Sequence, residues 1–162
     1  MYIRLRLLSF VVLALAAFAL PAARVPSTAL AQPGSDDALL RRLGAAGAVR
    51  VERHSETSSV RFLAAAPGQA LASPSLAAPG ASPEQVARAF LADYGQLFGI
   101  RNQDSELSLM RSVAGGAAST FVRFQQRHAG VPVLGGELVA QVRGGGVATV
   151  SGEALPELAV VC

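Results

Sequence analysis

The sequence is poor in the residues that disulfides, metal sites and nucleophilic catalysis require. It has one cysteine, Cys162, and two histidines, His54 and His128, among 162 residues. One cysteine excludes an internal disulfide, so we interpret Cys162 as an incidental thiol, with an intermolecular bridge as the less favoured alternative. A protein zinc site takes three or four ligands, and two scattered histidines do not supply them. We therefore predict no metal and no other cofactor.

Lysine and tryptophan are also absent, and positive charge is carried by 14 arginines against 11 acidic residues. Arg4, Arg6 and Arg24 belong to the N-terminal segment, and without them eleven arginines balance eleven acidic residues. The excess of positive charge is thus a property of that segment. It gives no support to a nucleic-acid or anionic-membrane partner for the remainder.

The N-terminal segment has the layout of a secretory signal peptide. Arg4 and Arg6 precede Leu7–Leu20, which is apolar except for one serine, and Ala29–Ala31 has the small-x-small pattern of a cleavage site. The alternative, a membrane anchor, needs about 20 apolar residues, more than this run supplies. We expect cleavage between Ala31 and Gln32 and a secreted, extracellular product with no membrane attachment.

Composition divides the rest of the chain into a leader, a linker, a main module and an exit segment. In the leader, Ser35 is a candidate helix cap and Leu39, Leu40 and Leu43 form one apolar stripe. Two short alternating segments after this helix predict a hairpin over 48–65. Proline, alanine and serine then indicate a linker with little to bury. The predicted boundaries are signal peptide 1–31, leader 32–66, linker 67–81, main module 82–152 and exit segment 153–162.

The main module opens with a strong helix signal. Ser82 is a helix cap, Pro83 suits the first helical position, and Gln85 completes a capping box. Apolar residues at helical spacing continue to Gly99, which ends the helix. A strand over 106–113 follows, in which Leu107, Leu109 and Arg111 alternate with Ser108, Met110 and Ser112.

Thr120–Val150 carries the clearest strand pattern. Val122 and Phe124 fall on one face of a strand over 121–128, and Arg123, Gln125 and Arg127 fall on the other. Glycine and proline at 130–132 require a bend, a second strand covers 137–143, and the glycines at 144–146 permit a tight turn into a third. The expected fold class is α+β, a helix packed on a four-stranded antiparallel sheet after a short helix and hairpin leader.

The residue order in this stretch resembles the fungalysin/thermolysin propeptide domain, found in the amino-terminal pro-region of secreted thermolysin-like zinc metallopeptidases. The resemblance covers roughly 82–152. It implies a partner, the peptidase catalytic domain, and a role as folding chaperone and inhibitor. Arg123, Gln125, Arg127 and Glu137 are candidate partner contacts, although a solvated sheet face is an equal alternative. The motif consists of Arg123, Phe124, Gln125, Gln126, Gly130, Val131, Pro132, Val133, Gly135, Gly136 and Glu137, with the glycines and proline shaping the bend.

No catalytic constellation accompanies the resemblance. Thermolysin-type catalysis needs two histidines one helical turn apart with an adjacent glutamate, and the sequence has no such motif. We therefore predict a chain that is not itself an enzyme. Three alternatives stay open: a free-standing inhibitor or chaperone acting in trans, the front piece of a metalloendopeptidase, and a secreted interaction module of merely similar architecture.

Overall fold

The computed structural model describes residues 33–75 and 77–156. The expected signal peptide, its cleavage site at Ala31–Gln32 and Cys162 lie outside these residues. The exit segment is described only to Pro156. The elements are α1 (Pro33–Ala46), β1 (Val49–Arg53), β2 (Val60–Ala65), α2 (Pro83–Tyr94), the 3-10 helix η1 (Gly95–Phe98), α3 (Gln103–Glu106), β3 (Leu107–Ala114), β4 (Ser119–His128), β5 (Val131–Arg143) and β6 (Gly146–Glu153).

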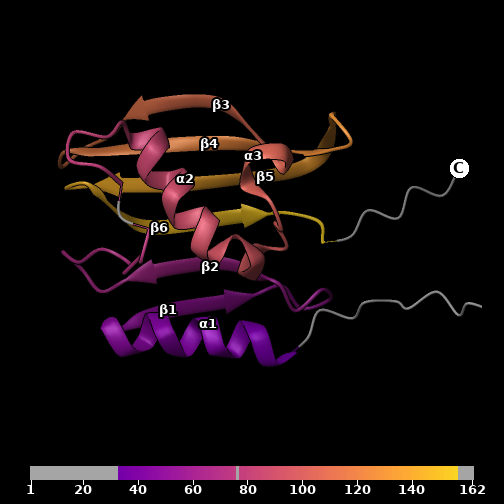
Figure 1. Cartoon of the computed structure of the whole chain (residues 1–162), viewed down its shortest axis with the longest axis horizontal. Helices are drawn as coiled ribbons and strands as arrows, with labels where there is room; N and C mark the ends of the chain where they lie inside the picture. The colour runs from indigo at the N-terminus through magenta and orange to yellow at the C-terminus, as the bar shows by residue number, and fades with distance from the viewer. Residues whose placement is uncertain (1–32, 76, 157–162) are drawn as a thin grey trace, which may run out of the picture. The chain divides into compact units, whose positions relative to one another are not determined.

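The strands form one antiparallel sheet in the order β1-β2-β6-β5-β4-β3 (Figure 1). The expected α+β class and the β4-β5-β6 meander are confirmed. The expected size of the sheet, four strands, was wrong, because the leader hairpin joins the same sheet and adds β1 and β2 beside β6. Leu63 of β2 pairs with Val150 of β6, so leader and main module share a sheet. The division into separate domains stays a prediction.

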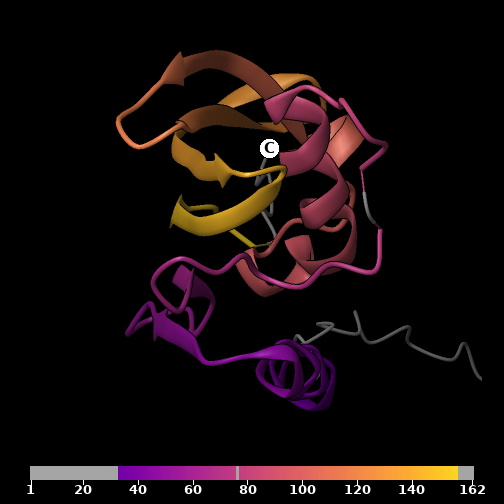
Figure 2. The same cartoon turned by 90° about the vertical axis from the view of Figure 1, so that its left-hand side faces the viewer.

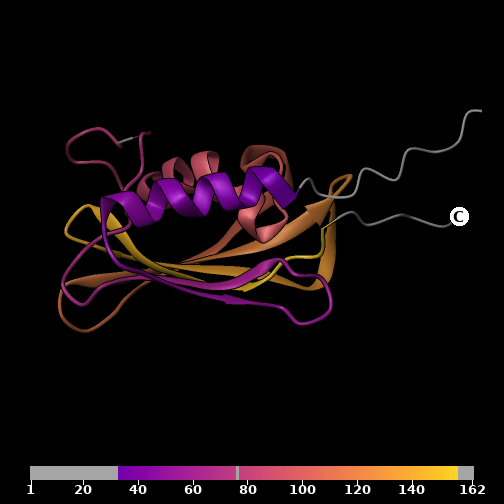
Figure 3. The ribbon, with the colours of Figure 1, turned by 90° about the horizontal axis from the view of Figure 1, so that it is seen from below.

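All the helices lie on the same side of the sheet (Figures 2 and 3). Alternation along the strands turns Val122, Phe124 and Leu138 toward these helices, where each is fully buried. Phe90 and Tyr94 of α2 pack on them, with ring centroids 5.0 Å apart. Leu43 of α1 belongs to the same core, so the leader helix also covers the sheet. No helix of the described residues lies on the opposite face (Figure 3).

The main helix begins and ends as the sequence predicts. Ser82 Oγ accepts the Gln85 backbone N–H and the Gln85 side chain accepts the Ser82 N–H, which completes the capping box. After Tyr94 the helix tightens into η1, and Gly99 ends it with a φ of 80°. The leader helix differs at its start: α1 begins at Pro33, so Ser35 lies inside the helix rather than at its cap.

The expected linker is tied to the fold at two places. Leu71 is buried, 5% exposed, and its N–H donates to the carbonyl of Val147 in β6 at 2.7 Å. The carboxylate of Asp93 in α2 accepts hydrogen bonds from the Ser73 hydroxyl and from both the N–H and the hydroxyl of Ser75. The expectation that this segment has little to bury is wrong at Leu71.

The environment of Asp93 predicts that the attachment of the linker depends on pH. Burial acts to raise the pKa of Asp93, but the hydrogen bonds from Ser73 and Ser75 outweigh it and the pKa is lowered from 3.8. A lowered pKa means that the ionised form stabilises the fold above the unfolded pKa, and that this contribution is lost as pH falls through the folded pKa.

We expect Asp93→Asn to lower the free energy of unfolding by about 1–2 kcal/mol at pH 7, because a charged acceptor of three hydrogen bonds is lost. The difference from the parent chain should shrink as pH falls below 3.8. Urea unfolding at pH 7 and at pH 3 measures both. Adding Ser73→Ala and Ser75→Ala to Asp93→Asn should cause little further loss. A difference that stays constant with pH would contradict the assignment.

Candidate functional site

The hairpin between β4 and β5 carries most of the sequence motif, and it is irregular at its centre. Gln125 pairs with Glu137 and Arg127 pairs with Pro132, so four residues, Val133–Gly136, lie opposite the single residue Gln126. Extra residues in one strand form a bulge, whose carbonyls lose their partners in the ladder. The bulge carries Leu134, which is 99% exposed.

Gln125 supplies the hydrogen bonds that the bulge lacks. Its Nε2 donates to the carbonyl oxygens of Val133 at 2.7 Å and Gly136 at 2.9 Å, and more weakly to Gln126 at 3.2 Å. Gly135, with a φ of 78°, provides the left-handed backbone of the bend. Gln125 was predicted as a partner contact, and its amide is already engaged inside the hairpin.

Gln126 faces the other way, into the protein, and is 4% exposed. Its Nε2 donates to the Leu155 carbonyl and its Oε1 accepts the Leu155 N–H, each at 2.9 Å. The side chain thus pairs with a backbone unit as a neighbouring strand would. Gly136 leaves room for it, because a Cβ there would lie 2.6 Å from Gln126 Oε1. Gln126 thereby fixes the point at which the chain leaves the sheet.

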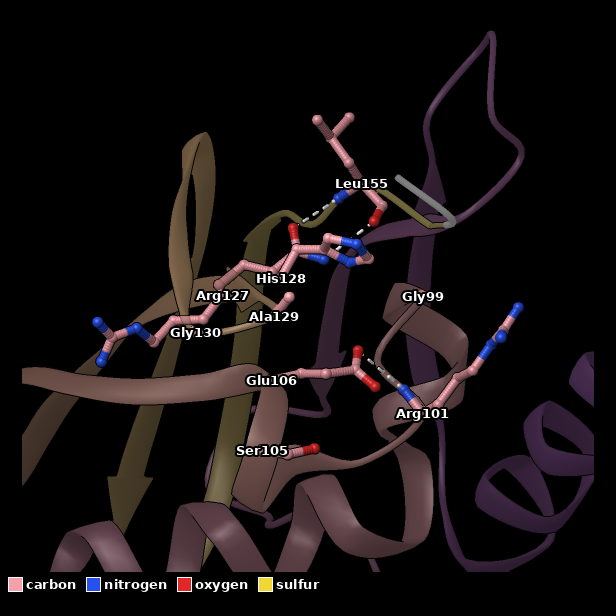
Figure 4. Close-up of a pocket in the computed structure, with 10 residues that line it drawn as sticks. Gly99, Arg101, Ser105, Glu106, Arg127, His128, Ala129, Gly130 and Leu155 are labelled. Carbon is pink, nitrogen blue, oxygen red and sulfur yellow. Dashed lines mark hydrogen bonds between the residues drawn. The ribbon is translucent and has the colours of Figure 1, made fainter. Parts of the chain in front are cut away.

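A hollow of about 610 Å³ lies beside this exit (Figure 4). Glu106 on its wall accepts the backbone N–H groups of Arg101 and Asn102, so its carboxylate closes a local turn. The guanidinium groups of Arg101 and Arg127 point to opposite sides in the close-up. The lining residues are Gly99, Arg101, Ser105, Glu106, Gln126, Arg127, His128, Ala129, Gly130 and Leu155.

The remaining predicted contacts lie on β4 and β5. Arg123 Nη1 and Glu137 Oε2 form an ion pair at 2.9 Å across the two strands, with side chains 36% and 37% exposed. The Arg127 Nε is buried and has no hydrogen-bond partner among the described residues. The structure therefore joins Arg123 to Glu137, gives Gln125 and Gln126 internal roles, and leaves partner contact a prediction.

A depression of about 300 Å³ lies on the uncovered face, where no sequence pattern predicts one. Its lining includes Arg111, which alternation assigned to the same face as Leu107. The structure contradicts that assignment, because a bulge between Leu109 and Arg111 moves Arg111 to the opposite face, across from Arg123. Strict alternation cannot reveal a bulge of one residue. The depression is lined by Arg111, Val113, Phe121, Arg123 and Val139.

The histidines have separate places. His54 lies in the β1–β2 turn, where Nδ1 accepts the N–H groups of Glu56 and Thr57 at 3.2 and 3.4 Å. His128 ends β4 and is exposed. Across 33–75 and 77–156, no group of three or more histidine, cysteine, aspartate or glutamate side chains is placed to hold a metal ion. No helix in those ranges is long and apolar enough to span a bilayer.

Comparison with known families finds a match to the fungalysin/thermolysin propeptide motif over residues 105–154. Neither curated proteins nor solved structures give a match. The matched range runs from the end of α3 through β3, β4, β5 and β6 to the start of the exit segment. It therefore includes the bulged hairpin, Gln126 and all the residues that line the depression, and it ends one residue before Leu155. This motif is a propeptide element and not a catalytic domain, and propeptides that carry it pair with a peptidase catalytic domain. Residues 105–154 of this chain are thus similar to the fungalysin/thermolysin propeptide motif.

Proposed function

We propose that the chain is a secreted propeptide module that helps a thermolysin-like catalytic domain to fold and holds it inactive. The observation that carries the proposal is the position of the motif. Helices cover one face of its four strands, while no helix of the described residues covers the other face (Figure 3). The signal peptide predicted before Gln32 supports export of the module together with, or to, a secreted peptidase.

A propeptide that binds only the folded catalytic domain stabilises that domain through the linkage between binding and folding. The same contact inhibits the enzyme if it covers the active-site cleft. The sheet suits this role because its hairpin is internally braced: Gln125 bonds to the bulge, and Arg123 bonds to Glu137. A preformed surface loses little conformational entropy on binding.

Thermolysin is the probe for this proposal. We expect the exported chain, with Gln32 as its first residue, to raise the yield of active enzyme when denatured thermolysin is diluted into buffer. We also expect it to inhibit the folded enzyme in proportion to its concentration. The same chain after irreversible heat denaturation serves as control. If the chain changes neither the refolding yield nor the activity of thermolysin, the proposal is overturned.

A further inference from the structure

The depression on the uncovered face has an apolar part with a fixed shape. Phe121 and Val113 are opposite each other on β4 and β3 and are 39% and 47% exposed. Val139 of β5 closes the third side. The Phe121 ring packs against Gly115, where a Cβ would lie only 2.5 Å from a ring carbon. The ring therefore has a defined place before any partner arrives.

The depression also has an unbalanced charge. Arg111 and Arg123 lie directly opposite each other on β3 and β4, an arrangement that is unfavourable for like charges. Glu137 neutralises Arg123 through the ion pair at 2.9 Å. Among the described residues Arg111 has no carboxylate partner. The surface thus offers one positive charge without a counter-charge beside an exposed aromatic ring.

We propose that this depression binds an extended acidic segment of the peptidase catalytic domain, with a carboxylate on Arg111 and a neighbouring apolar side chain over Phe121. The proposal rests on the function proposed above and names the surface through which it acts. The occupant is inferred from charge complementarity, because the uncompensated Arg111 favours an acidic segment. The lining of the depression contains no carboxylate, so a second copy docked depression to depression would bring a second uncompensated Arg111 and no counter-charge, and that repulsion disfavours self-association.

Synthetic peptides test the chemistry without the enzyme. Two fluorescein-labelled ten-residue peptides share one sequence with a central leucine, which is flanked by glutamates in one peptide and by lysines in the other. We expect the exported chain to bind the glutamate peptide at least about tenfold more tightly, since a cation beside an apolar contact selects for an anion. Arg111→Glu should reverse this preference. Arg143→Glu makes the same charge change at an exposed position outside the depression and should preserve it.

Fluorescence anisotropy at low salt measures the affinities. Equal binding of the two peptides, absence of binding at about 1 mM, or equal effects of Arg111→Glu and Arg143→Glu would overturn the proposal. Thermolysin inhibition is then measured with the parent chain, Arg111→Glu and Arg143→Glu. This measurement distinguishes the proposed docking surface from the proposed function. Inhibition that Arg111→Glu leaves unchanged refutes the docking surface and keeps the proposed function. A glutamate preference without any effect on thermolysin supports the surface and refutes the function.

Discussion

Gly152→Ala is expected to lower the free energy of unfolding by about 4 kcal/mol, a large part of the stability of a domain of this size. Gly152 lies in β6 opposite Leu138, with a φ of 147° that side chains rarely adopt. A Cβ at this position would lie 2.0 Å from the Glu137 carbonyl oxygen and 2.9 Å from the Leu138 Cα. Both atoms are backbone, so no rotamer change relieves the clash.

The position of β6 in the sheet increases the effect. β6 joins β5 to β2, so it holds the leader hairpin to the strands of the propeptide motif. Urea unfolding followed by circular dichroism measures the loss. Gly116→Ala is the matched control, because a Cβ there meets nothing within 4 Å and the glycine does not have a positive φ. We expect this control to change stability by less than about 0.5 kcal/mol. Similar losses in the two variants would contradict the steric argument.

The parts of the fold that the sequence predicted well depend on neighbouring residues. Ser82 and Gln85 are three residues apart, so their capping box requires no knowledge of the rest of the chain. The β5–β6 turn is equally local, since Gly144 and Gly145 both have positive φ. Alternation along β4 identified its buried face because that pattern extends over one uninterrupted strand.

The parts that escaped prediction depend on residues far apart in the sequence. Alternation in the leader indicated which face of β2 is buried, but not that Leu63 pairs with Val150. The pairing of strands is determined by interactions throughout the sheet, so the sequence of one segment contains little information about its partner. Leu71 was overlooked because its surroundings are rich in proline and alanine. Its burial is decided by β6, to which it is hydrogen-bonded.

The sequence pattern around Gln126 contains a signal for its internal role. It continues the buried series of Val122 and Phe124, so alternation places an amide at a core position. Buried side-chain amides need hydrogen-bond partners. The sequence therefore implied that some other segment must come to Gln126. It could not identify Leu155 as that segment, because their separation of 29 residues carries no local pattern.

Gln126→Ala is expected to release the exit segment. It removes both hydrogen bonds to Leu155 and leaves a gap beside Gly136, a loss of about 2 kcal/mol. Because opening of the segment limits its proteolysis, cleavage by a glutamate-specific endoprotease after Glu153 should be accelerated about tenfold or more. Mass spectrometry of timed digests measures this rate.

Gln125→Ala is the matched control, because it removes the neighbouring amide while leaving Gln126 intact. Gln125 bonds to Val133 and Gly136, so its loss should loosen the bulge and spare the exit segment. Amide hydrogen exchange should rise within Val133–Gly136 in Gln125→Ala and at Leu155 in Gln126→Ala. If both variants expose Glu153 equally, the two glutamines stabilise only the hairpin as a whole. If Gln125→Ala loosens only the bulge and Gln126→Ala releases only the exit segment, adjacent residues of the propeptide motif have distinct roles. Gln125 then stabilises the hairpin, and Gln126 fixes the point at which the chain leaves it.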